Sequence, residues 1–275
     1  MPALKGGLRP VFAKGVAHRD RPASPRKLVS MRLPGTETPL KAVLWDMDGT
    51  IVDTEPYWIA AEHALVEAHG GTWSHEQAMQ LVGQSLTFSA GLLQEAGVAM
   101  EIREIIDTLT SQVISSVRQQ VPWRPGAREL LEDLHQSGVR CALVTMSEGP
   151  LARQVVDSLP RQYFEFLVTG DTVSRGKPHP EAYLTAVERL RETDPHLHLG
   201  HCVALEDSAP GVAAAVASGV ATVAIPHIVP LPEHSHYTLW DTLEGRTRED
   251  LEQLLTEAGN HGPAGEPASA VGNTP

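Results

Sequence analysis

Between residues 40 and 258, short apolar runs alternate with longer stretches whose apolar residues recur every three or four positions. The runs are almost entirely apolar after their first residue, which is typical of parallel strands that helices cover on both faces, and the longer stretches have the period of amphipathic helices. We predict strands at about 41–45, 140–144, 165–168, 202–205 and 221–225, and helices at about 126–137, 148–158, 180–192, 210–218 and 248–258. This alternation indicates an α/β fold with a doubly wound, mostly parallel, five-stranded Rossmann-like core.

One interval departs from this alternation. It contains no strand pattern, only helix-like pieces at 57–68, 74–82, 87–96 and 101–119. Its length is far too great for a simple connection inside a compact domain. We therefore predict a helical cap domain at 57–121, inserted into a catalytic core that is formed by 38–56 and 122–258.

The two ends of the chain have the composition of disordered tails. Residues 1–41 hold nine Lys or Arg and two acidic residues, in a chain whose net charge is −12. Both ends are rich in Pro and Gly and show no apolar period. We predict a disordered basic N-terminal tail at 1–37, with Met31 as an alternative start, and a disordered C-terminal tail at 259–275. A passive N-terminal tail is favoured over an arm that contacts nucleic acid or a membrane.

Charge and hydropathy narrow the class of protein further. The acidic body of the chain argues against nucleic acid as the main partner. No apolar run reaches membrane-spanning length, and the N-terminus lacks the apolar stretch of a secretory signal. Cys141 and Cys202 are the only cysteines and lie in apolar runs, so we predict buried free thiols. We expect a cytoplasmic monomer that binds neither nucleic acid nor membranes.

Polar side chains gather where the predicted strands end. Asp46 and Asp48 directly follow the first strand, in "VLWDMDGT". In open parallel sheets, ligands bind beyond the carboxyl ends of the strands. Three other strand ends supply matching groups, which are Thr145 and Ser147 after the second, Lys177 after the third, and Glu206 and Asp207 after the fourth. Each group alone could belong to a turn or a helix cap, but their recurrence at successive strand ends indicates one shared site.

The charges of these residues indicate a metal ion and a phosphate. Asp46, Asp48, Glu206 and Asp207 would bring four negative charges together, and Lys177 offsets only one of them. Such a cluster must raise a pKa or bind a hard cation, and Mg²⁺ prefers carboxylate and water oxygens. With Mg²⁺ bound and Asp48 protonated, a phosphate dianion can enter. The arrangement therefore suits phosphoryl transfer to a carboxylate.

Four sequence motifs, in this order, resemble those of the haloacid dehalogenase superfamily: "DMDGT", "VTMS", "GKPHPEAY" and "LEDSAPGV". More narrowly, the chain resembles the β-phosphoglucomutase-like phosphatases of that superfamily, which insert a helical cap after the first motif. The resemblance implies a Mg²⁺-dependent phosphatase that acts on a small-molecule phosphate ester, such as a sugar phosphate or a nucleotide-like metabolite. It implies that Asp46 attacks phosphorus and forms an aspartyl-phosphate. Asp48 would protonate the leaving oxygen and then deprotonate the attacking water.

The same resemblance implies which residues bind metal, phosphate and substrate. Phosphate binding falls to Thr145, Met146 and Lys177. The Mg²⁺ site falls to Asp46, the Asp48 carbonyl and Asp207, with Glu206 nearby. The candidates for substrate specificity are Trp58, Gly83, Gln84 and Ser85.

Two departures from the mutases of this family favour hydrolysis. Trp58 stands where those mutases have a His, and the loop "VGQSLTFS" has Leu86 where they have an Arg. An Arg is well suited to hold the second phosphate that a mutase must bind. A phosphosugar mutase is the alternative enzyme. The alternatives outside enzymes are a phospho-accepting receiver module, which is shorter and lacks a cap, and a binding module.

Overall fold

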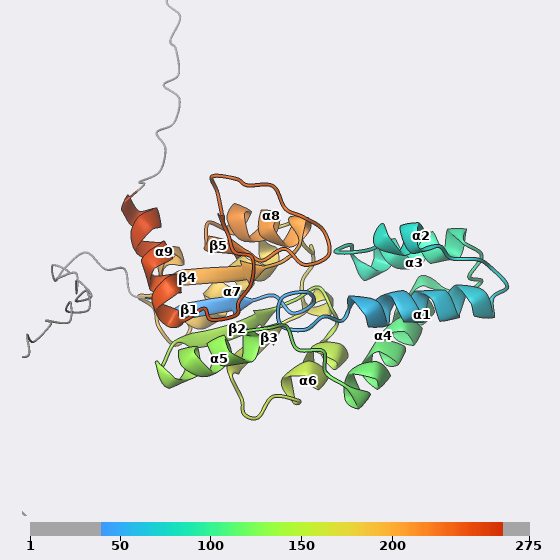
Figure 1. Cartoon of the computed structure of the whole chain (residues 1–275), viewed down its shortest axis with the longest axis horizontal. Coiled ribbons are helices and arrows are strands. Elements are labelled where there is room, and N and C mark those ends of the chain that lie inside the picture. Colours follow the sequence, from blue (N-terminus) through green and yellow to red (C-terminus); the bar gives the residue numbers. More distant parts are fainter. Residues whose placement is uncertain (1–39, 261–275) are drawn as a thin grey trace, which may run out of the picture. The chain divides into compact units, whose positions relative to one another are not determined.

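Six strands form one sheet in the computed structural model, which describes residues 40–260 (Figure 1). The strand order is β3-β2-β1-β4-β5-β6, and every neighbouring pair is parallel. The strands are β1 (Ala42–Trp45), β2 (Arg140–Val144), β3 (Phe164–Val168), β4 (Cys202–Glu206), β5 (Ala221–Ala224) and β6 (Thr238–Leu239). The predicted N-terminal tail and residues 261–275 of the predicted C-terminal tail lie outside the described residues.

The five predicted strands are confirmed, and each of their ends lies within one residue of the prediction. The sixth strand was not predicted. It consists of two residues, Thr238 and Leu239, which pair with the end of β5. Two residues are too few to show a periodic pattern, and they follow a segment rich in Pro and His that reads as a loop.

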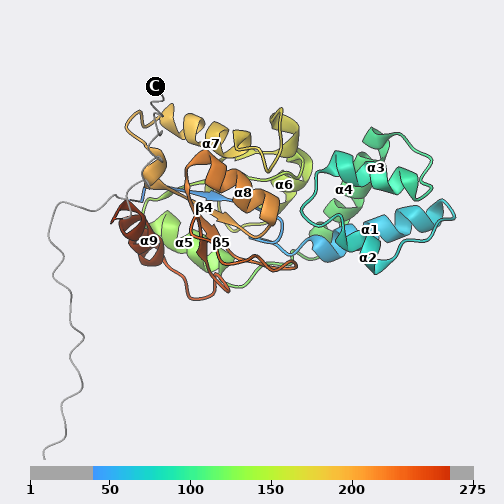
Figure 2. The ribbon, with the colours of Figure 1, turned by 90° about the horizontal axis from the view of Figure 1, so that it is seen from above.

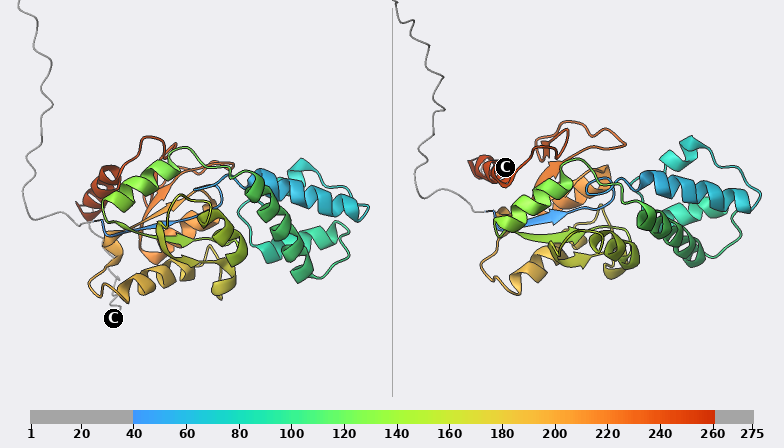
Figure 3. Two further views of the ribbon diagram at one scale, coloured as in Figure 1. Left: turned by 90° about the horizontal axis from the view of Figure 1, so that it is seen from below. Right: turned by 60° about the horizontal axis from the view of Figure 1, so that its bottom comes forward.

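Helices cover both faces of the sheet, because alternate residues of each strand point to opposite sides. Val43 and Trp45 of β1 pack into a core shared with α5, α6 and α9, whereas Ala42 and Leu44 pack into one shared with α7 and α8. Figures 2 and 3 show α7 on the opposite side of the strands from α5 and α9. These helices are α5 (Ala127–Gln136), α6 (Gly149–Val156), α7 (Glu181–Arg191), α8 (Ala209–Ser218) and α9 (Arg248–Asn260). The predicted doubly wound α/β core is therefore confirmed.

The register of the central strands brings their carboxyl ends to the same level. β1 lies between β2 and β4, and its last residue, Trp45, pairs with Leu143 on one side and Leu205 on the other. The residues that follow these strands consequently leave the sheet side by side. This edge is where a ligand site is expected in a parallel sheet.

Four further helices lie between β1 and α5 in the chain, where the sequence shows no strand pattern. They are α1 (Glu55–Ala68), α2 (His75–Met79), α3 (Leu86–Glu95) and α4 (Ile102–Gln119). Apolar residues of all four helices are buried together. Figures 1 and 2 show this segment beyond the edge of the sheet toward which β1 runs. The helix α2 ends three residues earlier than predicted, shortly before the turn at Gly83, whose φ is 74°.

Two adjacent stretches of chain join α1–α4 to the rest of the fold. Val52 forms an antiparallel bridge with Trp123, and the Asp53 N–H donates to the Pro122 carbonyl at 2.8 Å. The outgoing and returning stretches are thus paired with each other. Within residues 40–260 no helix has an apolar stretch of membrane-spanning length. Cys141 and Cys202 are buried free thiols, as predicted.

Candidate active site

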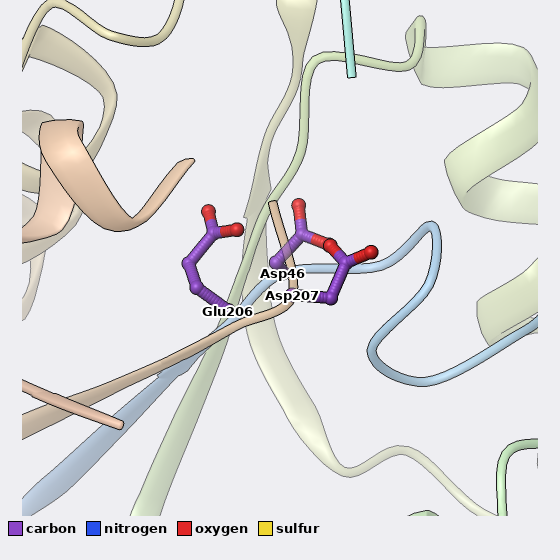
Figure 4. A group of neighbouring side chains, drawn as sticks. All are labelled: Asp46, Glu206 and Asp207. Atoms are coloured by element: carbon purple, nitrogen blue, oxygen red, sulfur yellow. The ribbon is translucent and has the colours of Figure 1, made fainter. Parts of the chain in front are cut away.

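Three carboxyl groups meet at the carboxyl ends of β1 and β4. Asp46 directly follows β1, Glu206 is the last residue of β4, and Asp207 comes next. One carboxylate oxygen from each residue lies within 4.8 Å of the others. Figure 4 shows the three side chains next to one another above the strand ends. The structure therefore brings together three of the four acidic residues that the sequence assigned to a metal site.

Lys177 joins this acid cluster from the loop between β3 and α7. Its Nζ donates to Asp46 Oδ1 at 2.6 Å and to the Val144 carbonyl at 2.9 Å, and it lies 2.5 Å from Glu206 Oε1. Only 5% of the side chain is exposed. Burial alone would lower the pKa of Lys177, but the carboxylates of Asp46 and Glu206 outweigh that effect and raise it. The lysine is therefore a permanent buried cation.

Glu206 acts mainly on Lys177. It is fully buried, and Oε1 accepts a hydrogen bond from the Tyr183 hydroxyl at 2.5 Å in addition to facing Lys177. Backbone packs closely against its other oxygen, since a Cβ at Gly211 would lie 1.9 Å from Oε2. A side chain held by so many neighbours has little freedom to move. Glu206 thus fixes the position of the lysine as well as adding charge to the cluster.

Asp46 has one carboxylate oxygen that no group in the described structure satisfies. Oδ1 accepts from Lys177, whereas Oδ2 is buried without a hydrogen-bond partner. Burial, together with the neighbouring charges of Glu206 and Asp48, outweighs Lys177 and raises the pKa of Asp46 to about 8. Burial also raises the pKa of Asp207 well above its usual range. A buried carboxylate oxygen that lacks a donor, with a second carboxylate beside it, suits a hard divalent cation.

Gly49 leaves room for this arrangement. Its φ is 85°, which a residue with a side chain rarely adopts. A Cβ at this position would lie 1.9 Å from Asp207 Oδ2. The turn after β1 can therefore approach Asp207 only because residue 49 is a glycine. The acids Asp46 and Asp207 and the close turn together fit a Mg²⁺ ion.

The carboxylate of Asp48 has a different set of neighbours. It accepts hydrogen bonds from the hydroxyls of Thr54 at 2.5 Å, Ser147 at 2.7 Å and Thr145 at 3.2 Å. This side chain does not belong to the group of Asp46, Glu206 and Asp207 that could hold a metal ion. The two acids of the "DMD" motif thus separate into two environments, one next to Lys177 and one among hydroxyls. Thr54 was missed, because a Thr six residues along the chain carries no pattern of its own.

Thr145 and Met146 connect the two environments. The Thr145 hydroxyl donates to Asp48 and accepts the Ser147 N–H at 3.0 Å. The Met146 sulfur accepts the Lys177 backbone N–H at 3.2 Å. These contacts orient Asp48 and the lysine loop. Both residues also line the cavity described next, where the sequence expected them to bind phosphate.

A cavity of about 110 Å³ opens above these residues. Its volume is several times what one water needs. Asp46, Asp48, Lys177 and Asp207 line it, and so do residues of α1, α3 and α4. Of the four candidates for substrate specificity, Trp58, Gly83 and Gln84 line it. Ser85 does not, since its hydroxyl accepts the Phe88 N–H at 3.3 Å and begins α3 as an N-cap.

The cavity is also lined by three titratable residues that were not among the site residues expected from the sequence. Glu55 and Glu62 lie on α1, and His227 lies in the loop after β5. The Arg124 guanidinium donates to His227 Nδ1 at 2.7 Å, and His227 Nε2 lies 2.8 Å from Asp53 Oδ1. A helical period could have placed the two glutamates on one face of α1, but not against a cavity. Nothing in the local sequence of His227 pointed to the site.

The raised pKa values predict that Mg²⁺ stabilises the protein more at about pH 8 than at about pH 6. The pKa of Asp46 is 3.8 in its ordinary state and about 8 here, so folding binds a proton between these values. Without metal, the free energy of unfolding therefore falls as the pH rises through this window. A cation must displace that proton, and it binds more tightly where the proton is already lost.

Melting temperatures with and without Mg²⁺ at both pH values test this prediction. The shift is expected to be larger at the higher pH and to be lost in Asp207→Asn. Equal shifts at both pH values would show that Mg²⁺ does not compete with protons in this cluster.

Comparisons with known proteins indicate the family and the fold of this chain. Residues 43–225 match the family model described as haloacid dehalogenase-like hydrolase. The phosphorylated carbohydrates phosphatase of Thermotoga maritima is 30% identical over 66% of this chain and 82% of its own length. Hexitol phosphatase A of Escherichia coli is 31% identical over 67% of this chain and 82% of its own. The crystal structure of β-phosphoglucomutase from Clostridium difficile has the same fold, with a TM-score of 0.68 and 20% identity, over 80% of this chain and 98% of that one.

Proposed function

Because this chain belongs to the haloacid dehalogenase-like hydrolases, we propose that it is a phosphatase that hydrolyses a small phosphorylated metabolite, with sugar phosphates as the substrate class. One observation carries this proposal. Asp46, buried against Lys177, and Asp48, held by three hydroxyls, face the same small cavity. A nucleophile beside a cation and a second acid within the same site are the parts that the reaction needs.

The acid cluster supports a Mg²⁺ ion as the cofactor. Asp46 and Asp207 would supply carboxylate oxygens, with Glu206 behind them, and the unsatisfied Oδ2 of Asp46 is the observation that favours this assignment. The Asp48 carbonyl remains a proposed ligand. When bound, Mg²⁺ supplies positive charge that offsets the acids and the incoming phosphate.

The residues of the chain divide the chemistry between them. Asp46 attacks phosphorus, the bond from phosphorus to the leaving oxygen breaks, and an aspartyl-phosphate forms. Asp48 gives a proton to the leaving oxygen, so the product departs as an alcohol. Asp48 then takes a proton from water as the water attacks the phosphorylated Asp46, which releases inorganic phosphate and restores both acids. Lys177 stays charged throughout and stabilises the negative charge on the phosphoryl group.

We further propose that residues 57–121 form a cap that closes over the cavity. Helices α1, α3 and α4 contribute to its walls, and the turn at Gly83 lies against the loop after β4. A Cβ at Gly83 would lie 3.4 Å from the Ser208 Cβ. A cap in this position would keep bulk water away from the aspartyl-phosphate until the alcohol has left.

The cavity favours hydrolysis over the mutase alternative. Trp58 and Leu86 line it at the positions where mutases of this family have a His and an Arg. Among the lining residues that the structure describes, Lys177 is the only Lys or Arg, and it already contacts Asp46 and Glu206. A mutase must hold a second phosphate while its intermediate turns round. No further lysine or arginine is among the described lining residues, so water is the better acceptor.

Incubation with Mg²⁺ and a panel of phosphate monoesters tests the proposed function. We expect inorganic phosphate to be released with multiple turnovers, and a chelator to lower the rate by about tenfold or more. Isomerised sugar phosphate without free phosphate would instead identify a mutase. A stable phosphate adduct without turnover would identify a receiver-like module, and neither product nor adduct would identify a binding module.

A further inference from the structure

One face of α1 presents acids to the cavity. Glu55, Trp58 and Glu62 are spaced three and four residues apart, so they lie on the same side of the helix. All three line the cavity. The helix thus contributes two carboxyl groups to the cavity, and neither has a part in the proposed chemistry.

Glu62 is the more unusual of the two. Its side chain is 4% exposed, and its one hydrogen bond among the described residues comes from the Trp73 indole N–H to Oε2 at 3.3 Å. Burial raises the pKa of Glu62 to about 8, with a smaller contribution from Glu55, and no cation compensates it. A buried carboxyl without a cation is costly for folding. A carboxyl group that lowers stability in this way and faces a ligand cavity is expected to have a role in binding or catalysis.

The residues that α3, α4 and the stretch between α2 and α3 add to the cavity carry no charge. They are Leu81, Val82, Gly83, Gln84, Leu86, Ser89 and Leu109. A second phosphate or a carboxylate on the substrate would meet the two glutamates, and no lysine or arginine other than Lys177 is among the described lining residues. Hydroxyl groups would meet partners, because a carboxyl group accepts hydrogen bonds in either state and donates one when protonated.

We propose that Glu62, held by Trp73, is a specificity-determining residue that hydrogen-bonds hydroxyl groups of the substrate, and that the substrate is a sugar or polyol with a single phosphate. This inference rests on the proposed phosphatase function. Glu55 lines the same cavity and offers a further hydrogen-bonding group to hydroxyls of the substrate. A site built to bond a hydroxyl rejects molecules that lack it, since its buried polar groups then stay unpaired.

The test compares two kinds of substrate in matched variants. Sorbitol 6-phosphate, glucose 6-phosphate and ribose 5-phosphate provide hydroxyls, and p-nitrophenyl phosphate does not. In Glu62→Leu we expect kcat/KM for the preferred hydroxylated substrate to fall by about 10–100-fold and by much more than kcat/KM for p-nitrophenyl phosphate. Glu62→Gln keeps hydrogen-bonding groups and is expected to lose less. Glu67→Gln, on an exposed turn of the same helix, is the control and should change neither.

Two results would overturn the inference. One is a folded Glu62→Leu variant whose ratio between the two kinds of substrate stays within about threefold of wild type. The other is a wild-type preference for fructose 1,6-bisphosphate or 3-phosphoglycerate over the singly phosphorylated sugars, which needs no variant at all. Turnover of p-nitrophenyl phosphate by the wild type keeps these outcomes separate from failure of the proposed function, which would abolish that turnover as well.

Discussion

Replacing Asp46 with Asn is expected to abolish phosphate release, with a loss of about 10⁴–10⁶-fold, the range seen when an enzyme loses its nucleophile. An amide does not attack phosphorus, and it also removes one negative oxygen from the group that could hold a metal ion. The hydrogen bond from Lys177 can persist, since an amide oxygen still accepts it. The variant should therefore fold with an intact lysine position and fail at the first chemical step.

The melting temperature of Asp46→Asn shows whether a loss of activity comes from the missing nucleophile or from a failure to fold. Because burial raises the pKa of Asp46 to about 8, the ionised carboxyl destabilises the metal-free fold as the pH rises from 3.8 toward that value. Asp46→Asn lacks this charge, so its melting temperature without metal is expected to equal or exceed that of the wild type near neutral pH. Asp157→Asn, at an exposed position, is the matched control and should keep full activity. Residual turnover above the blank in Asp46→Asn would assign the nucleophile elsewhere.

Replacing Asp48 with Asn is expected to have an effect that depends on the substrate. Three hydroxyls hold the carboxylate of Asp48, and an amide can keep part of this arrangement. The variant retains the nucleophile but has neither a proton for the leaving oxygen nor a base for water. General acid–base catalysis is typically worth about 10²–10⁴-fold. We expect a loss in this range for alkyl phosphates and a smaller loss for aryl phosphates, whose leaving groups need little protonation.

The measurement is the rate as a function of leaving-group pKa, combined with mass spectrometry for a phosphate adduct on Asp46. The variant should show a steeper dependence than the wild type, and the adduct should persist because water is no longer activated. Ser147→Ala removes only one of the hydroxyls that hold Asp48 and is expected to reduce the rate without changing the leaving-group dependence. The same dependence in wild type and Asp48→Asn would show that Asp48 is not the acid.

Contacts among Lys177, Glu206 and Tyr183 explain how several carboxyl groups can lie close together next to the cavity. Lys177 contacts Asp46 and Glu206 together, and Tyr183 donates to Glu206 from the side. Asp46 and Glu206 therefore each have a neighbour that opposes their charge or donates a hydrogen bond to them, but one oxygen of Asp46 has no partner among the described residues. This oxygen, Asp46 Oδ2, lies where the metal and the phosphate are proposed to bind.

The sequence alone determined the order and type of the elements. Short apolar runs such as residues 140–144 must be buried on both faces, and their identity as parallel strands follows from that burial. The shared edge was equally accessible to sequence reasoning, because parallel strands that end at one level bring Asp46 and Asp207 together. Lys177 lies well beyond the end of β3 and reaches Asp46 from its loop. β6 was not accessible, since pairing over two residues depends on where the preceding loop returns.

Only the tertiary structure decided which neighbours each acidic side chain has. Asp46 and Asp48 are two residues apart in the chain, but one meets Lys177 and the other meets Thr54 and Ser147, because the turn after β1 bends between them. Likewise, the helical period can place Glu62 on the inner face of α1 but cannot say whether that face meets a core or a cavity. Local patterns encode which side of an element is buried. What lies against that side is set by contacts between residues far apart in the chain, and these contacts decide the pKa of each acid and the chemistry that it can perform.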